Sequence, residues 1–204
     1  MEFAVKERSK NLSADQRRQV TVQAVLDIAA EQDPGDITTA AIAERMQVTQ
    51  GALFRHFPSK DALWGSVMDW VAGQLLARTE RAGAGPESPL AGVRAIFMAH
   101  IEFVSEHPGV PRMLFGVLQK PAASPARQMA QRLLEKYTER LCVLFERAKA
   151  CGEASPDLDA RIAALMFIGS IQGLVMQSMM LGDHRHIRRS ADEVFELYLR
   201  GVRT

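Results

Sequence analysis

A cluster of hydrogen-bonding side chains lies between residues 38 and 64, in the segment TTAAIAERMQVTQGALFRHFPSKDALW. Threonine, arginine and lysine side chains donate hydrogen bonds to phosphate oxygens, and a glutamine amide pairs with adenine in the DNA major groove. Gln50 is therefore the first candidate for base recognition, and Lys60 is a candidate for positioning through a phosphate. The full set of candidate DNA-contacting residues is Thr39, Thr49, Gln50, Gly51, Phe54, Arg55, His56 and Lys60.

Two short helices joined by a tight turn must position these side chains. Thr38 or Thr39 is a suitable N-cap for the first helix, and Thr49 opens the second. Phe54 and Phe57 are expected to anchor the second helix, and Phe54 could also touch the sugar-phosphate backbone. A helix that lies in a major groove needs this division between a packed side and a polar side.

The charge balance gives no support to nucleic-acid binding by itself. The net charge of the 204-residue chain is +1, and the first 65 residues carry eight basic and nine acidic side chains. Because phosphate attraction supplies most non-specific DNA affinity, the hypothesis requires basic side chains to gather on one face. The residues that would have to gather are Arg17, Arg18, Arg55 and Lys60.

Helical periodicity dominates the whole chain, and strand signals are weak. Ser13 is a plausible N-cap for a first helix that ends near residues 33–35, and Ser59 caps a long helix. Later helices are expected at about 90–106, 112–119, 126–150 and 158–181, with a last one after the polar loop 182–187. The prediction is an all-α protein, with a helix-turn-helix DNA-binding domain over residues 1–62 and an effector-binding and dimerisation domain over residues 63–204.

Flexible apolar side chains are frequent in the second half of the chain. Methionine adapts to irregular cavities, so these residues could line a pocket for a lipophilic small molecule. The alternative is a closed hydrophobic core, in which the same residues only pack against one another. The candidate pocket residues are Met98, His100, Phe103, Met113, Met129, Leu133, Tyr137, Met166 and Phe167.

Residues 162–181, IAALMFIGSIQGLVMQSMML, form an uncharged apolar run long enough to span a bilayer. Polar residues dilute the run and no aromatic belt flanks it, so we favour a helix covered partly by its own domain and partly by a second subunit. The two glycines would then permit close backbone approach. The candidate dimer-interface residues are Gly169, Gly173, Met176, Met180, Val194 and Tyr198.

Signatures of catalysis and of metal binding are missing from the sequence. His100 and His107 are separated by about 10.5 Å of helical rise, which is too far for one ion. Cys142 and Cys151 have no Cys-x-x-Cys spacing, and no nucleophile–base pattern or phosphate-binding glycine loop occurs. We expect no enzyme activity, no metal and no cofactor, and, because no signal peptide is visible, a cytoplasmic protein with reduced thiols.

The helix-turn-helix residues resemble those of the tetracycline-repressor (TetR/AcrR) family of bacterial transcriptional regulators. The resemblance implies that Thr39 and Lys60 contact phosphates, and that the second short helix approaches the groove from Thr49 onward. Phe54 departs from the usual tyrosine, Gln47 departs from the usual glycine of the turn, and the first helix lacks the family's aromatic-plus-glycine ending. The matching residues are Thr38-Thr39, Ile42-Ala43, Val48, the run Gly51-x-Leu53-aromatic-x-His56-Phe57, and Ser59-Lys60-x-x-Leu63.

Two functional hypotheses follow from these observations. The resemblance implies a ligand-responsive transcriptional regulator, commonly a repressor, that binds a palindromic operator in double-stranded DNA as a homodimer and is released by a small lipophilic effector. Its two recognition helices would meet successive major grooves roughly 34 Å apart. The alternative is an all-α ligand- or partner-binding module with a degenerate helix-turn-helix that no longer binds DNA, which the departures at Phe54 and Gln47 motivate. Neither hypothesis involves a membrane.

Overall fold

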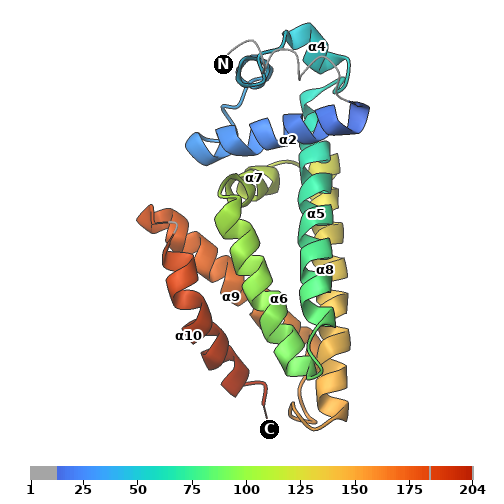
Figure 1. Cartoon of the computed structure of the whole chain (residues 1–204), viewed down its shortest axis with the longest axis vertical. Helices are drawn as coiled ribbons and strands as arrows, with labels where there is room; N and C mark the ends of the chain where they lie inside the picture. Colours follow the sequence, from blue (N-terminus) through green and yellow to red (C-terminus); the bar gives the residue numbers. More distant parts are fainter. Residues whose placement is uncertain (1–12, 184, 204) are drawn as a thin grey trace. The chain divides into compact units, whose positions relative to one another are not determined.

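The computed structural model describes residues 13–183 and 185–203, and within these ranges the chain is all-α (Figure 1). Within these ranges, Ala154 and Arg203 form an isolated antiparallel β-bridge. The prediction of an all-α protein is confirmed. The helices are α2 (Ala14–Glu31), α3 (Thr39–Arg45), α4 (Gln50–Phe54), α5 (Lys60–Ala84), α6 (Pro89–Glu106), α7 (Gly109–Leu118), α8 (Pro125–Ala150), α9 (Ala160–Leu181) and α10 (His186–Arg200).

Side-chain caps explain where several helices begin. Ser13 accepts a hydrogen bond from the Gln16 amide, while the Gln16 side chain accepts one from the Ser13 amide, which completes a capping box at α2. The Thr38 hydroxyl caps α3 by accepting from the Ala41 amide, and the Ser59 hydroxyl accepts from the Ala62 amide in the first turn of α5. These starts agree with the sequence expectation to within a residue.

Two helices begin earlier than the sequence pattern predicts, in both cases because proline is tolerated in the first helical turn. Pro89 is the first residue of α6, and Pro111 lies within the first turn of α7, which begins at Gly109. Conversely, α9 begins at Ala160 rather than near residue 158, because the Asp159 carboxylate caps it by accepting from the Arg161 and Ile162 amides.

The described residues divide into two compact units. Of the described residues, the first unit contains 13–72 and 107–130, and the second contains 73–106, 131–183 and 185–203. Helices α5 and α8 therefore contribute residues to both units. We refer to them as unit 1 and unit 2.

Unit 1 is built on the packing of α2 against α7 and of α3 against α2 and α4. At the start of α7 the backbone of Gly109 lies so close to α2 that a Cβ atom would stand 2.0 Å from the Leu26 carbonyl oxygen. Only glycine allows this approach, since real Cβ contacts are never so short. The core of the unit is formed by buried side chains such as Val22, Val25, Phe57 and Leu63.

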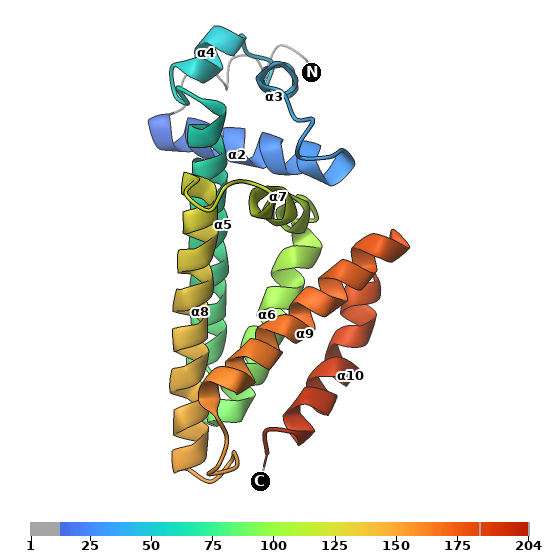
Figure 2. The ribbon, with the colours of Figure 1, turned by 180° about the vertical axis from the view of Figure 1, so that it is seen from behind.

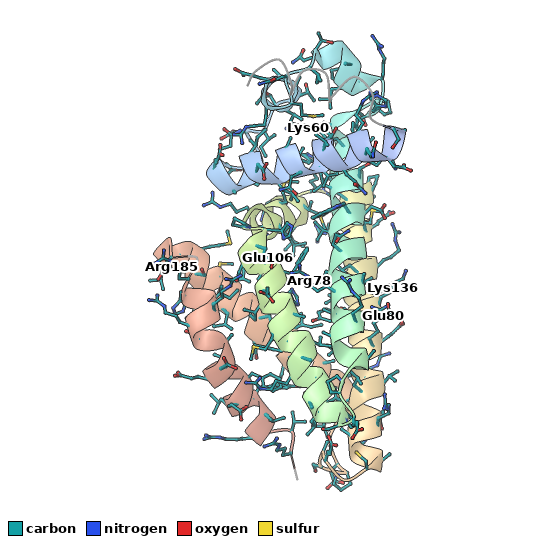
Figure 3. All side chains as sticks on the ribbon, in the orientation of Figure 1. Lys60, Arg78, Glu80, Glu106, Lys136 and Arg185 are labelled. Carbon is teal, nitrogen blue, oxygen red and sulfur yellow. The ribbon has the colours of Figure 1, made fainter. Side chains whose placement is uncertain are left out.

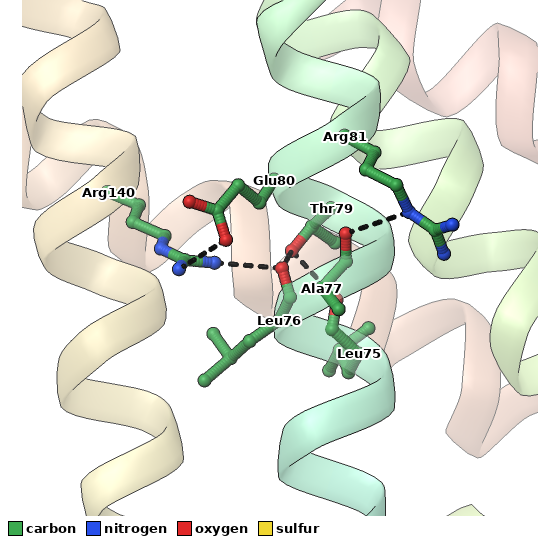
Figure 4. A network of polar contacts seen from close by, with 7 residues as sticks. All are labelled: Leu75, Leu76, Ala77, Thr79, Glu80, Arg81 and Arg140. Carbon is green, nitrogen blue, oxygen red and sulfur yellow. Dashed lines mark hydrogen bonds and ion pairs between the residues drawn. The ribbon is translucent and has the colours of Figure 1, made fainter.

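Unit 2 is built on α6, α9 and α10, which contact one another pairwise (Figure 2). A chain of aromatic contacts forms its core, with ring centroids 5.3 Å apart for Phe97–Phe167 and 5.1 Å for Phe97–Phe195. Within unit 2, Arg140 of α8 joins this helix to α5 by donating to the Leu76 carbonyl at 2.8 Å and to Glu80 at 3.0 Å (Figure 4).

Among the described residues one helix, α9, is long and apolar enough to cross a membrane, judged by length and composition alone. One side of it packs in unit 2, where Phe167, Ile171 and Leu174 are buried. It ends at Gly182, whose φ of 64° places it in the left-handed region that favours glycine. Its other side carries large exposed apolar side chains, which are considered with the candidate sites.

Candidate nucleic-acid interface

Helices α3 and α4 have a packed side and a polar side, as the sequence pattern predicts. Ile42 and Ala43 on α3 and Leu53 on α4 are buried, and Phe57 after α4 is buried with them. Thr49 is the N-cap of α4, with its hydroxyl accepting a hydrogen bond from the Ala52 amide at 3.2 Å. The packed side therefore fixes α4 against its own unit and leaves the opposite side exposed.

The turn between α3 and α4 passes through Gln47, whose φ of 55° lies in the left-handed region. A non-glycine residue costs roughly 1–2 kcal/mol in this conformation, which explains why glycine is common at this point of the motif. The departure from glycine therefore changes the energy of the turn without preventing it: the Gln47 amide donates to the Glu44 carbonyl, and the Val48 amide donates to the Ala43 carbonyl.

The start of α4 is open to a partner molecule. Thr49, Gln50 and Gly51 are all exposed, whereas Thr39 at the start of α3 is half-buried. A Cβ atom at Gly51 would meet nothing within 4 Å. The packing of the protein itself therefore does not require glycine there, although glycine weakens a helix by roughly 0.5–1 kcal/mol relative to alanine.

The end of α4 is tied to α2 by a hydrogen bond between Arg17 and His56, with 3.0 Å between Nη1 and Nε2. A guanidinium only donates, so His56 accepts through Nε2 and carries its proton on Nδ1. This contact brings Arg17 beside His56, and the preceding residue, Arg55, is exposed. Arg17 and Arg55 thus approach the same end of α4.

The remaining candidates for DNA contact lie around these residues. Lys60 is exposed at the start of α5, where its Nζ lies 3.5 Å from the Gly35 carbonyl oxygen and 5.5 Å from the centre of the Trp64 ring (Figure 3). Phe54 is 44% exposed, so the expectation that it anchors α4 is wrong, and of the two phenylalanines only Phe57 is buried. The phenyl ring of Phe54 is instead available to a partner molecule.

Acidic residues of unit 1 are partly neutralised by basic residues that lie outside this polar side. Arg45 at the end of α3 pairs with Glu31 at 2.5 Å, and Lys120 pairs with Asp61 at 3.0 Å. Hydrogen bonding to Arg45 also holds the pKa of Glu31 below its ordinary value. The pair with Lys120 therefore neutralises one of the nine acidic side chains of the first 65 residues.

The candidate pocket residues do not form one group. Met113 and Met129 belong to unit 1, and the others belong to unit 2. In unit 2, His100 Nδ1 and the Tyr137 hydroxyl are 3.1 Å apart, and the Tyr137 ring stands edge-on to Phe167. Met98 and Leu133 are half-buried and Phe103 is buried.

Met166 is a correction to the predicted pocket, because it is 59% exposed on the outer side of α9. Its neighbour Phe167 points into the core, and adjacent helical residues differ in direction by about 100°. Methionine content alone could not tell these two sides apart.

An open groove in unit 2 lies away from the predicted pocket, between the outer side of α8 and the start of α9, with a volume of about 850 Å³. No sequence pattern pointed to it. Its lining combines exposed apolar residues with four carboxylates and two basic side chains: Leu134, Glu135, Thr138, Glu139, Cys142, Val143, Glu146, Lys149, Leu158, Asp159, Ala160 and Arg161.

An apolar stripe runs along the outer side of α9 and includes most of the predicted dimer-interface residues. Gly169 is exposed, Gly173 is half-buried, and a Cβ atom at either would meet nothing within 4 Å. The sequence analysis missed Leu197 on α10, which is exposed and lies one helical turn from the predicted Val194. The large exposed residues of the α9 stripe are Ile162, Leu165, Met166, Met176, Met180 and Leu181.

Tyr198 is a correction to the predicted dimer interface. It is 9% exposed, and its hydroxyl donates to the Ala163 carbonyl at 2.9 Å within the same chain. Burial raises its pKa. Tyr198 therefore holds α10 against α9 in the core of unit 2, while Val194 is half-buried at the edge.

Neither cysteine has the environment of a reactive thiol. Burial raises the pKa of the half-buried Cys142, and Cys151 is exposed, with its Sγ directed to the Ala148 carbonyl oxygen at 3.5 Å. Among residues 13–183 and 185–203 no three histidine, cysteine, aspartate or glutamate side chains come together as metal ligands.

Two family descriptions match the chain. "Bacterial regulatory proteins, tetR family" matches residues 22–67, which include α3, the turn and α4. "Tetracyclin repressor-like, C-terminal domain" matches residues 120–194, which include α8 and α9. The motif is therefore matched in spite of the departures at Gln47 and Phe54, which removes the main reason for considering a degenerate helix-turn-helix.

Similar proteins include the nucleoid occlusion factor SlmA of Vibrio cholerae serotype O1, which is 27% identical over 159 residues, covering 77% of this chain and 81% of that protein. The factor of the same name from Sodalis glossinidius is 28% identical over 175 residues, covering 85% of this chain and 86% of that protein.

Solved structures share the fold at lower identity. The transcriptional regulator FadR from Bacillus subtilis, in complex with stearoyl-CoA, has a TM-score of 0.78 at 20% identity and covers 90% of this chain and 98% of its own. The ketosteroid transcriptional regulator KstR2 of Mycobacterium tuberculosis has a TM-score of 0.76 at 19% identity, covering 92% and 95%. The chain therefore belongs to the TetR family of bacterial transcriptional regulators, and it is a DNA-binding transcription factor rather than an enzyme.

Proposed function

We propose that the protein is a ligand-responsive repressor that binds a palindromic operator as a homodimer in the cytoplasm and releases it when a small lipophilic effector binds. The observation that carries this proposal is the division of exposed groups between two compact units. Unit 1 exposes the polar start of α4, and unit 2 exposes the apolar stripe of α9.

The exposed residues of unit 1 have distinct roles in this proposal. Gln50 recognises a base, because its side-chain amide can pair with adenine, and Gly51 lets the start of α4 approach the DNA backbone closely. Thr39, Thr49, Arg55 and Lys60 contact phosphates, which position the helix without specifying sequence. His56 is held by Arg17 and completes the surface at the end of α4, and Phe54 contacts the sugar-phosphate backbone.

The stripe on α9 supports a second copy of the chain as the dimer partner. Exposed side chains of this size are costly in water, at about 25 cal/mol per Å² of apolar surface. Gly169 and Gly173 lie in the middle of the stripe and leave room for close approach of another helix. A two-fold dimer would present two copies of α4, which is why we propose a palindromic operator.

A lipophilic effector is supported by the composition of unit 2 and by one structural neighbour. His100, Tyr137 and Phe167 lie together in this unit, and the half-buried Met98 and Leu133 belong to the same two helices as His100 and Tyr137, α6 and α8. The similar regulator from Bacillus subtilis was solved with stearoyl-CoA bound. We therefore expect an elongated or polycyclic apolar ligand.

Helix α7 is the proposed route by which ligand binding reaches α4. It follows α6 directly in the chain, after the break at His107 and Pro108, and its first residue Gly109 touches α2. A ligand that displaces the end of α6 would move α7, and with it α2 and the attached α4. A coupling free energy of about 1–3 kcal/mol would weaken DNA binding about 5- to 150-fold.

In vitro transcription from the promoter upstream of the protein's own gene tests the repressor assignment. Adding the purified protein should reduce transcript from this promoter and leave an unrelated promoter unchanged. An increase in transcript would replace the repressor assignment by an activator, and no change at saturating protein would contradict regulation of its own gene.

A further inference from the structure

His100 and Tyr137 form a polar pair inside the apolar part of unit 2. His100 lies on α6 and Tyr137 on α8, with 3.1 Å between Nδ1 and the hydroxyl oxygen and 5.4 Å between ring centroids. The pair lies at one end of the aromatic core, because Tyr137 also packs against Phe167, which packs against Phe97. Tyr137 is buried and His100 is half-buried.

The pair has unused hydrogen-bonding capacity whichever way its proton is placed. If the Tyr137 hydroxyl donates to Nδ1, His100 keeps a free Nε2–H donor and the phenol oxygen keeps an acceptor lone pair. If Nδ1–H donates to the phenol oxygen, the hydroxyl proton and the Nε2 lone pair are free. In the described part of the chain no partner is seen for Nε2. In either arrangement one member of the pair keeps a free donor and the other keeps a free acceptor.

Both members of the pair are uncharged at neutral pH. Burial lowers the pKa of His100 to about 4 and raises the pKa of Tyr137, and no charged side chain contributes to either shift. Two arginines of α5 and α8 pair with carboxylates instead: Arg78 pairs with Glu106 at 2.7 Å, and Arg140 pairs with Glu80 (Figure 3, Figure 4).

We propose that His100 and Tyr137 recognise an uncharged hydroxyl or carbonyl oxygen on a lipophilic ligand and discriminate against a carboxylate. A hydroxyl or a carbonyl oxygen accepts a hydrogen bond from whichever member of the pair keeps the free proton, either His100 Nε2–H or the Tyr137 hydroxyl. A carboxylate would bring a negative charge into an apolar region without a cation, which is far more costly than burying a hydrogen-bonded neutral group. This specificity deepens the proposed function, because the ligand is taken to be the effector.

A matched ligand series tests the proposal without any mutation. Dodecanol, 2-dodecanone and dodecanoate have the same chain length, and only dodecanoate is charged at neutral pH. Titration calorimetry with the full-length protein, below the aggregation concentration of each probe, should give at least about tenfold tighter binding of the two neutral probes. Equal or tighter binding of dodecanoate, or no binding of any probe, would overturn the proposal.

Two tyrosine variants test whether binding of the neutral probe depends on the Tyr137 hydroxyl. Tyr137→Phe removes one hydroxyl and keeps the ring, so dodecanol should bind about tenfold more weakly, as expected for one lost hydrogen bond. Tyr198→Phe is the matched control, because it removes a buried hydroxyl that bonds to Ala163 in the same unit. Binding of dodecanol should not change in this control. Equal effects of the two variants, or no effect of Tyr137→Phe, would remove the pair from the ligand site.

The failure of this inference can be told apart from the failure of the proposed function. Tight, Tyr137-dependent binding of dodecanol with no loss of DNA affinity would leave the specificity of the site standing and contradict its role as the effector site. Release of DNA by dodecanoate but not by dodecanol would support a ligand-responsive regulator and contradict the specificity proposed for His100 and Tyr137.

Discussion

At the scale of single residues, Gly51 connects the stability of the protein to its function. Alanine would fit at this position, because a Cβ atom meets nothing within 4 Å, and it would favour the helical backbone of α4. Glycine at position 51 is explained if DNA occupies the space that a Cβ atom would fill. Stability and DNA binding should therefore respond in opposite directions to a change at Gly51.

Gly51→Ala is expected to raise the free energy of unfolding by about 0.5–1 kcal/mol and to weaken operator binding about tenfold or more. Chemical denaturation and fluorescence anisotropy measure the two quantities. Gly73→Ala on α5 is the control, since it also has open space around its Cβ position and lies outside α4. Unchanged DNA affinity in Gly51→Ala would place the DNA contact elsewhere.

Gln47 is the second residue at which the turn can be tested. Gln47→Gly relieves the left-handed strain of roughly 1–2 kcal/mol, of which about 0.5–1 kcal/mol is lost to the greater freedom of unfolded glycine. The expected result is a net stabilisation of about 0.5–1 kcal/mol in a denaturant titration. Destabilisation would mean that the Gln47 side chain makes a contact more valuable than the backbone strain.

Residue-level predictions from the sequence succeeded where one physical pattern decided the outcome. Phe57 and the caps Ser13 and Thr49 follow from helical spacing and from hydrogen-bonding chemistry. The sequence could not show whether Met166 and Tyr198 face the core or the surface. Helix α9 is apolar on both sides, and Tyr198 on α10 could pack within its own unit or against a second subunit. Only the packed structure shows which side is covered.

At the scale of helices, Glu153 stabilises the start of α6 from a distant part of the chain. Its Oε2 accepts from the Leu90 amide at 2.9 Å and from the Ser88 hydroxyl at 2.8 Å. The hydrogen bond from the Leu90 amide is the main reason that the pKa of Glu153 is lowered. The contribution is therefore full above the ordinary glutamate pKa of 4.5 and is lost as the pH falls through the lowered value of the folded state.

Glu153→Ala is expected to lower the free energy of unfolding by about 1 kcal/mol at neutral pH, as for other lost caps. The difference from the wild type should shrink on acidification, which denaturant titrations at a series of pH values would measure. Glu146→Ala, which loses a surface pair with Lys149, should cost less than about 0.5 kcal/mol. A pH-independent effect of Glu153→Ala would contradict the role of the carboxylate.

Gly109 controls the contact between α7 and α2. Gly109→Ala places a Cβ atom 2.0 Å from the Leu26 carbonyl oxygen, so the helices must separate. The expected cost is about 3 kcal/mol, at the upper end of overpacking, measured by thermal unfolding. A Gly109→Ala protein as stable as the wild type would contradict this close contact. Unchanged release of DNA by the effector in this variant would show that the contact does not transmit the signal.

The helices themselves could largely be predicted from the sequence, because caps and prolines act locally. Two starts were placed too late, since Pro89 and Pro111 looked like breaks and are first-turn residues. The division into two compact units was not predictable in the same way. Long helices such as α5 contribute to both units, and no local signal marks the point where their contacts change.

At the scale of the whole molecule, the exposed apolar stripe of α9 predicts that a charged substitution within it dissociates the proposed dimer. Leu165→Glu, at a position 65% exposed, should convert the dimer to a monomer in sedimentation equilibrium and lower operator affinity. Leu118→Glu changes an exposed leucine of α7 and should leave the dimer intact. A monomeric wild-type protein, or a dimeric Leu165→Glu protein, would contradict the proposed interface.

The most direct test of the whole account is competitive fluorescence anisotropy of the intact protein on the DNA upstream of its own gene. At fixed salt, the wild type should prefer this DNA to a scrambled sequence by about 10³-fold or more, and Gln50→Ala should lose about 1–3 kcal/mol of that preference. Equal affinity of the wild type for the two DNA sequences would contradict the account.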